Sequence, residues 1–219
     1  MRIGIPREIK DHEFRVGLTP AGVRQLRAQG HDIRVESGAG AKIGFTDEGY
    51  RDAGATVCEA PEAVYEADLI IKVKEPQPRE YPLLREGQTL FCYLHLAASA
   101  DLTRALLARK IIGIAYETVT DAQGGTPLLH PMSEIAGRLS IQAGATTLEM
   151  AHGGHGTLLG GVPGVPPGRV AILGGGSVGT NAAKMAIGLG ADVTLLDVSA
   201  ARLRYLDDIF GPRLKTRYS

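Results

Sequence analysis

A glycine-rich turn in the second half of the chain has the spacing of a phosphate-binding loop. It reads Gly174-Gly-Gly176-Ser-Val-Gly179 and follows the apolar run 170–173. Between a predicted strand and a predicted helix, Gly174 can form the tight turn, Gly176 can leave room for a pyrophosphate, and Gly179 can let the helix pack on the strand. The amino end of that helix offers free N–H groups and a partial positive charge to the phosphates. The turn therefore predicts a dinucleotide-binding βαβ unit.

Asp197 provides the acidic residue that such a unit needs. It ends the next predicted strand, 192–196, and lies 18 residues beyond Gly179. A carboxylate at this place accepts hydrogen bonds from a ribose 2′-OH and repels the 2′-phosphate of NADP. The sequence therefore predicts NAD as the cofactor. The alternative is a glycine turn that serves packing alone.

Three residues of the first half could bind and transform a small anion. Arg15 follows the first predicted strand, Lys74 the third, and His95 the fourth. Residues just beyond the carboxyl ends of parallel strands face the crevice in which ligands bind. A guanidinium and an ammonium can hold a carboxylate, and an imidazole can move protons near neutral pH. These residues predict a site for a small acid that is oxidised; the alternatives are solvated cations and a histidine of the core.

The elements that position these residues alternate between strand and helix, which predicts an α/β fold with parallel βαβ units. Helices are expected to begin after Thr19-Pro20, Thr46 and Ser99. We predict a Rossmann-like (flavodoxin-like) substrate domain over 1–128 and an incomplete Rossmann NAD-binding domain over 129–219. The predicted strands are 2–5, 32–35, 69–73, 89–94, 111–115, 169–173, 192–196 and the start of a third strand in 213–219; the predicted helices of the second half are 133–152, 177–189 and 200–209.

The composition excludes several classes of function. The 24 basic and 24 acidic residues cancel, so no overall field favours nucleic acid or an anionic membrane. No apolar run approaches the roughly 20 residues of a transmembrane helix, and the charged N-terminus predicts a cytoplasmic protein. His152 and His155 lie in a glycine loop without a nearby third ligand, so no metal site is predicted. His130 is expected on the surface or in a turn.

With these residues identified, the chain resembles the bacterial alanine dehydrogenase family over its entire length. Many segments in one order make the resemblance specific. Besides the glycine turn, the matching segments are 1–6, 13–16, 18–22, 72–76, 94–98, 115–118, 131–138 and 160–165.

The resemblance implies an enzyme that reversibly oxidises L-alanine to pyruvate and ammonia, with NAD as hydride acceptor. It implies that Arg15 and Lys74 hold the substrate carboxylate and that His95 is the catalytic acid/base. It also implies cofactor contacts beyond the three glycines of the turn. The residues implied are Ser133, Ser177, Val178, Asp197, Arg202 and Ser219.

Two alternatives follow from the same resemblance. The NAD(H)-binding α subunit of transhydrogenase is related, but it generally lacks the segments around Lys74 and His95, which favour alanine dehydrogenase. Family members also continue beyond residue 219, where a catalytic aspartate and further nicotinamide contacts lie, and they form homo-oligomers, commonly hexamers. The chain could therefore be a non-catalytic NAD-binding fragment, and an exposed apolar patch is expected on its second domain.

Overall fold

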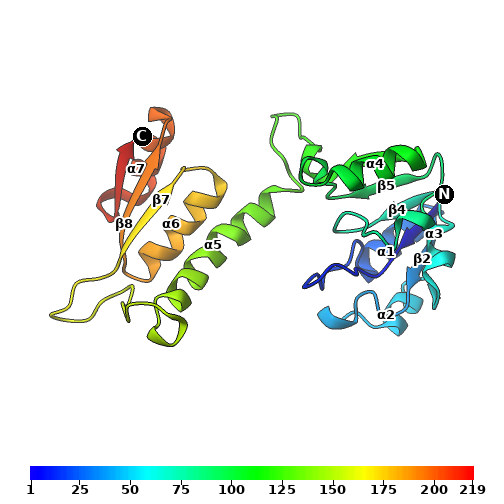
Figure 1. Cartoon of the computed structure of the whole chain (residues 1–219), viewed down its shortest axis with the longest axis horizontal. Helices are drawn as coiled ribbons and strands as arrows, with labels where there is room; N and C mark the ends of the chain where they lie inside the picture. The colour runs from blue at the N-terminus through cyan, green and yellow to red at the C-terminus, as the bar shows by residue number, and fades with distance from the viewer. The chain divides into compact units, whose positions relative to one another are not determined.

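The computed structural model describes residues 1–219 as two compact units, Met1–Thr126 and Pro127–Ser219. Each unit contains its own parallel sheet, and Figure 1 shows the two sheets with their helices. The boundary lies close to the predicted one after residue 128. No helix combines the length and the apolar character needed to cross a bilayer.

The first unit is built on a six-stranded sheet in the order β3-β2-β1-β4-β5-β6, with every neighbouring pair parallel. This is the strand order of Rossmann folds, which confirms the predicted fold class. It differs from the 2-1-3-4-5 order of flavodoxin-like sheets. The prediction of a flavodoxin-like first domain was therefore wrong in strand order. The strands are β1 Arg2–Ile5, β2 Asp32–Glu36, β3 Thr56–Cys58, β4 Leu69–Ile71, β5 Thr89–Cys92 and β6 Ile112–Ala115.

Hydroxyl caps fix where the main helices of this unit begin. The side chains of Thr19, Thr46 and Ser99 each accept a hydrogen bond from a backbone N–H three residues later, as the sequence predicted. The helix α3 and the strand β3 were not predicted, because both are short and carry no periodic pattern. The helices are α1 Pro20–Ala28, α2 Asp47–Asp52, α3 Pro61–Tyr65 and α4 Ala100–Arg109, with 3-10 turns at Ala41–Ile43, Tyr81–Leu83, Leu96–Ala98 and Tyr116–Thr118.

The core of the first unit lies on both faces of its sheet. Successive strand residues point to opposite faces, so Ile71 packs with Val23 of α1 and Tyr50 of α2, whereas Ile70 packs on the other side with Leu102 of α4. Burial on both faces is what a parallel sheet requires. This packing holds in place the strands whose carboxyl ends lead into the predicted substrate residues.

Strands β4 and β5 end earlier than predicted, but their main chains remain bonded to each other. The N–H of Lys72 donates to the carbonyl of Phe91, and the N–H of Tyr93 donates to the carbonyl of Val73. These two hydrogen bonds continue the contact after the regular ladder stops. The segments that bear Lys74 and His95 therefore leave the sheet together.

The second unit has three parallel strands in the order β7-β8-β9. Its third strand confirms the short strand predicted near the end of the sequence. Helix α5 begins at the His130-Pro131 pair, earlier than predicted, and it ends at Thr147 rather than near residue 152. The elements are α5 His130–Thr147, the 3-10 turn Met150–His152, β7 Arg169–Leu173, α6 Ser177–Gly188, β8 Asp192–Asp197, α7 Ala200–Phe210, the 3-10 turn Gly211–Arg213 and β9 Leu214–Tyr218.

Helices α5 and α6 approach each other closely in this unit (Figure 1). A Cβ on Gly137 of α5 would lie 2.2 Å from the carbonyl oxygen of Val178, so only glycine permits the approach. Apolar side chains are also exposed on this unit, including Ile135 and Leu139 of α5 and Leu173 of β7, which is 83% exposed.

Candidate functional site

The strand order of the first unit locates a crevice at the carboxyl ends of β1 and β4. From β1 the sheet continues through β2 to β3 on one side, and from β4 through β5 to β6 on the other, so the order reverses between β1 and β4. Ligands of open α/β sheets bind at this reversal. Arg15 lies on the segment after β1, Lys74 on the segment after β4, and His95 after the neighbouring β5. The fold brings all three predicted residues to one edge of the sheet.

Arg15 is held in place by Glu13. Its Nε lies 2.8 Å from Oε1 of Glu13 and its Nη2 lies 2.6 Å from Oε2, while the Arg15 backbone N–H also donates to Oε1. Burial alone would raise the pKa of Glu13, but these hydrogen bonds and the charge of Arg15 hold that pKa below its ordinary value. Arg15 is therefore a fixed cation rather than a freely solvated one.

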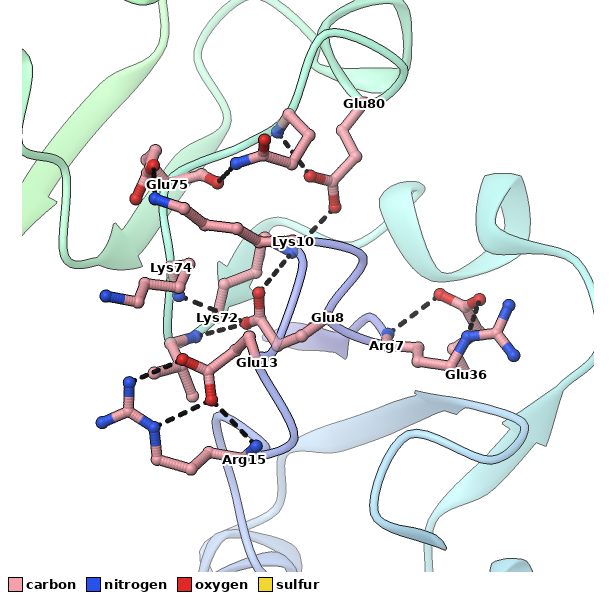
Figure 2. Close-up of polar contacts among 12 residues, drawn as sticks. Arg7, Glu8, Lys10, Glu13, Arg15, Glu36, Lys72, Lys74, Glu75 and Glu80 are labelled. Atoms are coloured by element: carbon pink, nitrogen blue, oxygen red, sulfur yellow. Dashed lines mark hydrogen bonds and ion pairs between the residues drawn. The ribbon is translucent and has the colours of Figure 1, made fainter. Parts of the chain in front are cut away.

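Lys74 lies near the same carboxylate but is not bound to it. Its positive charge contributes, after Arg15, to the lowered pKa of Glu13. Its half-buried side chain ends in an ammonium with no hydrogen bond or ion pair in the structure, and Figure 2 shows this ammonium pointing away from the buried carboxylate of Glu8. The site thus contains one paired cation and one cation that can bind an incoming anion.

His95 stands in a strained turn after β5. Its φ of 48° lies in the left-handed region, which a residue with a Cβ adopts at a cost. Glu117 stabilises the turn, because its carboxylate accepts the backbone N–H of His95 at 2.8 Å and that of Leu94 at 3.2 Å. The His95 side chain is exposed, which excludes the alternative of a core histidine. The role of Glu117 was not predicted from the sequence.

The imidazole of His95 has an aromatic and an acidic neighbour. Its ring stacks on Tyr93 with the centroids 6.0 Å apart, and Tyr93 in turn meets Tyr116 edge-on at 5.0 Å. Glu75 lies close enough for the charge of His95 to help lower its pKa, although the contact with Lys10 contributes more to that shift. Oε2 of Glu75 is buried and has no hydrogen-bond partner. The histidine therefore stacks on an aromatic ring and lies within electrostatic range of a carboxylate.

In the second unit, the glycine turn has the geometry of a phosphate cradle. Gly174 has a φ of +91°, which a side chain disfavours, and a Cβ on Gly179 would lie 1.9 Å from the carbonyl oxygen of Gly174. A Cβ on Gly176 would meet nothing within 4 Å, so the space before α6 is open. These are the three functions predicted for the glycines, and they fit a dinucleotide phosphate at the amino end of α6.

A cavity of about 850 Å³ adjoins this turn. Ser133 of α5 lines it together with the turn, and the nearby hydroxyl of Ser177 lies 3.1 Å from Nδ1 of His130. His130 is exposed, as predicted, but its contact with Ser177 was not predicted. The predicted cofactor residues that line the cavity are Ser133, Gly174, Gly176, Ser177, Val178 and Gly179.

Asp197 and Arg202 brace the outer side of the turn. The carboxylate of Asp197 accepts the N–H groups of Gly175 at 2.6 Å and Ser199 at 2.7 Å, and these hydrogen bonds lower its pKa. Arg202 donates to the carbonyl of Gly175 and to the hydroxyl of Thr180. The Ser219 N–H donates to the carbonyl of Asp197. These predicted cofactor residues therefore gather at the end of β8, outside the cavity.

Two family models match the chain. The model described as "Alanine dehydrogenase/PNT, N-terminal domain" matches residues 4–136, and the model described as "Alanine dehydrogenase/PNT, C-terminal domain" matches residues 140–219. Together they account for both units of the structure.

Similar proteins carry the corresponding names. The chain is 56% identical over 216 residues to "Alanine dehydrogenase 2" of Staphylococcus aureus (strain N315), a match that covers 99% of this chain and 58% of the relative. It is 55% identical over 220 residues to "Alanine dehydrogenase" of Geobacillus stearothermophilus, covering 100% of this chain and 59% of the relative. The chain thus spans a little under three fifths of the length of these curated relatives.

Solved structures show the same fold. A structure of L-alanine dehydrogenase superposes with a TM-score of 0.93 at 53% identity, covering 100% of this chain and 61% of the other. A transhydrogenase from Sinorhizobium meliloti superposes with a TM-score of 0.83 at 23% identity, covering 99% of this chain and 64% of the other. At that identity the second match supports the fold alone.

Proposed function

The chain belongs to the alanine dehydrogenase/PNT family, and from this membership we propose that it acts in the NAD-dependent oxidation of L-alanine to pyruvate and ammonia. The observation that carries the proposal is the arrangement at the reversal of the first sheet. There Arg15 and Lys74 occupy the two segments that flank the crevice, and His95 follows the next strand. Because the chain spans less than two thirds of the length of these relatives, the activity of the 219 residues is itself proposed.

Arg15 and Lys74 are the proposed carboxylate-binding residues. Glu13 fixes the guanidinium of Arg15 through two of its nitrogen atoms, so the cation is oriented before substrate binds. The ammonium of Lys74 has no anionic partner of its own and would gain one from the carboxylate of alanine or pyruvate. Preorganised cations of this kind stabilise bound substrate and the charge that develops during reaction.

His95 is the proposed acid/base. In oxidation the Cα–H leaves as hydride while the amine becomes an imine; NAD, when bound, supplies the hydride acceptor. His95 would then take a proton from the water that adds to the imine carbon, and ammonia leaves as the carbonyl of pyruvate forms. Its ring is exposed and stacks on Tyr93, so water can reach it and a neighbouring side chain supports it.

The second unit is proposed to bind the adenosine and pyrophosphate part of NAD. The open approach at Gly176 and the amino end of α6 suit the phosphates. Asp197 at the end of β8 suits the ribose and disfavours a 2′-phosphate. Ser133, Ser177 and Val178 would contact the cofactor from the cavity, and Arg202 and Ser219 from the end of β8.

A second candidate function is an NAD(H)-binding module without dehydrogenase activity. The glycine turn and Asp197 of the second unit favour it, because this candidate cofactor site is built without Arg15, Lys74 or His95. The resemblance further implies a homo-oligomer, commonly a hexamer in longer family members, which light scattering would measure directly.

Alanine-dependent formation of NADH, followed by its absorbance, tests the proposal. The assay should compare L-alanine with D-alanine, and this chain with a version extended to the length of its relatives. Calorimetric titration with NAD accompanies it. Turnover of L-alanine supports the dehydrogenase; NAD binding without turnover in both lengths supports the binding module; and failure of NAD to bind either length refutes both.

A further inference from the structure

A buried charge cluster connects the two segments that carry the substrate cations. Lys72 is 0% exposed, and its ammonium lies 2.7 Å from Glu80 and 3.2 Å from Glu8, whose side chains are 6% and 2% exposed. The hydroxyl of Tyr65 also donates to Glu80 at 2.7 Å. Figure 2 shows Glu8 between Lys72 and the Lys74 backbone. We call Glu8, Lys72 and Glu80 the Lys72 cluster.

Glu8 reaches from one segment to the other. It follows β1, as Arg15 does, whereas its partners belong to the segment after β4. Its Oε1 accepts the N–H of Val73 at 2.6 Å and that of Lys74 at 3.4 Å. The carboxylate is therefore bound to the backbone at the point where the Lys74 side chain begins.

We propose that Glu8 is a positioning residue of the substrate site, which sets the place of Lys74 relative to Arg15. The inference rests on the proposed function, because it assumes that both cations bind one carboxylate. Glu8 itself does not touch the substrate. It acts through the backbone of residues 73 and 74 and through the ammonium of Lys72.

The charge balance of the cluster supports this role. Lys72 and Glu80 alone would form a neutral pair, with Glu80 further bound by Tyr65 and by the N–H of Gln77. Glu8 adds a second buried negative charge, and burial is the main reason that its pKa is raised. Buried charges commonly contribute less to stability than apolar residues of similar volume. A second carboxylate is thus not needed to neutralise Lys72, but it is needed to join the segments.

Glu8→Gln separates positioning from folding. The variant leaves Lys72 and Glu80 as a neutral pair, so no buried charge loses its only counterion. A glutamine amide has one acceptor oxygen and one donor nitrogen, and both Lys72 and Val73 present donors to Glu8. One of the two contacts must therefore fail, which loosens the join between the segments.

Glu36→Gln is the matched control. Glu36 also lies at the carboxyl edge of the sheet, its side chain is 7% exposed, and it accepts the N–H of Arg7 at 2.9 Å. It resembles Glu8 in burial and in accepting a backbone N–H from a segment that follows another strand. Its hydrogen bonds do not include the segment that bears Lys74.

The experiment measures calorimetric affinity for pyruvate in the presence of NADH, affinity for NADH alone, and thermal stability. Glu8→Gln should weaken pyruvate binding about tenfold, the effect of losing one charge-assisted hydrogen bond, with NADH affinity unchanged. Glu36→Gln should leave both affinities unchanged. In an active form, KM for pyruvate should rise more than kcat falls.

Unchanged pyruvate affinity in Glu8→Gln, or an equal loss in Glu36→Gln, overturns the positioning role. If Glu8→Gln does not fold, Glu8→Asp replaces it: the charge remains, but the shorter side chain cannot keep both joins, and wild-type pyruvate affinity there also overturns the role. Absence of pyruvate binding without any substitution, both in this chain and in the extended version, is a different result, which refutes the proposed function and this role with it.

Discussion

The two units build their candidate sites from different parts of the chain. In the first unit the site consists of charged side chains, and paired or buried carboxylates such as Glu13 and Glu8 hold the cations in place. In the second unit it consists mainly of backbone, because glycines bring main-chain groups together at the start of α6. The comparison teaches that parallel α/β sheets can fix a ligand site in two ways: by pairing charged side chains, or by glycines that let main-chain groups approach closely.

The difference also determines how each site should fail. A site of side chains loses single functions when one residue is replaced, while the surrounding sheet remains. A site of backbone loses its shape when a Cβ is added where two main-chain segments touch, as at Gly179, because the neighbouring atom cannot move away without moving the main chain. Substitutions in the two units therefore test the comparison directly.

The largest effect is expected at His95. His95→Ala should lower alanine-dependent NADH formation in the active form by about 10²–10⁴-fold, the usual contribution of a general acid/base. NAD affinity should remain unchanged, because His95 belongs to the first unit and the proposed phosphate cradle to the second. Turnover and calorimetric titration measure the two quantities. Retained turnover would remove His95 from the mechanism.

Gly179→Ala should cause the next largest effect. Its Cβ would lie 1.9 Å from a main-chain oxygen, and overpacking of this kind costs about 1–3 kcal/mol. NAD affinity should fall about 10- to 100-fold because the turn and α6 must separate. Gly188→Ala in the same helix is the control, since its Cβ meets nothing within 4 Å. Equal NAD affinities in the two variants would contradict the steric account.

Asp197→Asn should weaken NAD binding about tenfold and reduce the preference over NADP, as expected when a charged acceptor becomes neutral. Hydrogen bonds from Gly175 and Ser199 lower the pKa of Asp197 from 3.8. The ionised form therefore persists below that pH. NAD affinity of the unsubstituted chain should thus show no loss from Asp197 between neutral pH and pH 5, and a loss assigned to this residue within that range would oppose the prediction.

The smallest effect is expected at His130. His130→Ala removes the partner of the Ser177 hydroxyl, an exposed hydrogen bond that contributes about 0.5 kcal/mol. NAD affinity should change about twofold, which calorimetric titration can resolve. A change as large as that of Asp197→Asn would mean that a side chain, rather than backbone, dominates the second site.

Much of the fold could be predicted from the sequence because its signals are local. Thr19, Thr46 and Ser99 cap helices through their own hydroxyls, and apolar runs mark strands that are buried on both faces. The short strand β3 and helix α3 could not be predicted, since three and five residues carry too little periodicity. The strand order is a long-range property, and only the structure distinguished the Rossmann order from the flavodoxin-like one.

The candidate sites divide in the same way. The glycine turn is identifiable because each glycine occupies a position where the local backbone disfavours a side chain or must leave space for a ligand. Arg15, Lys74 and His95 were predicted from their places after strands. The Lys72 cluster was not predicted, because a charged residue in an apolar run does not reveal its partners, and one of them, Glu8, lies on a segment far away in sequence.

The ring stack at the substrate site gives the chain a built-in optical reporter. The chain contains seven tyrosines and no tryptophan, so its ultraviolet emission comes from phenols alone. Tyr93 stacks on His95 and contacts Tyr116. An anion bound at Arg15 and Lys74 would change the field at Tyr93, and its arrival should therefore change tyrosine fluorescence without any attached dye.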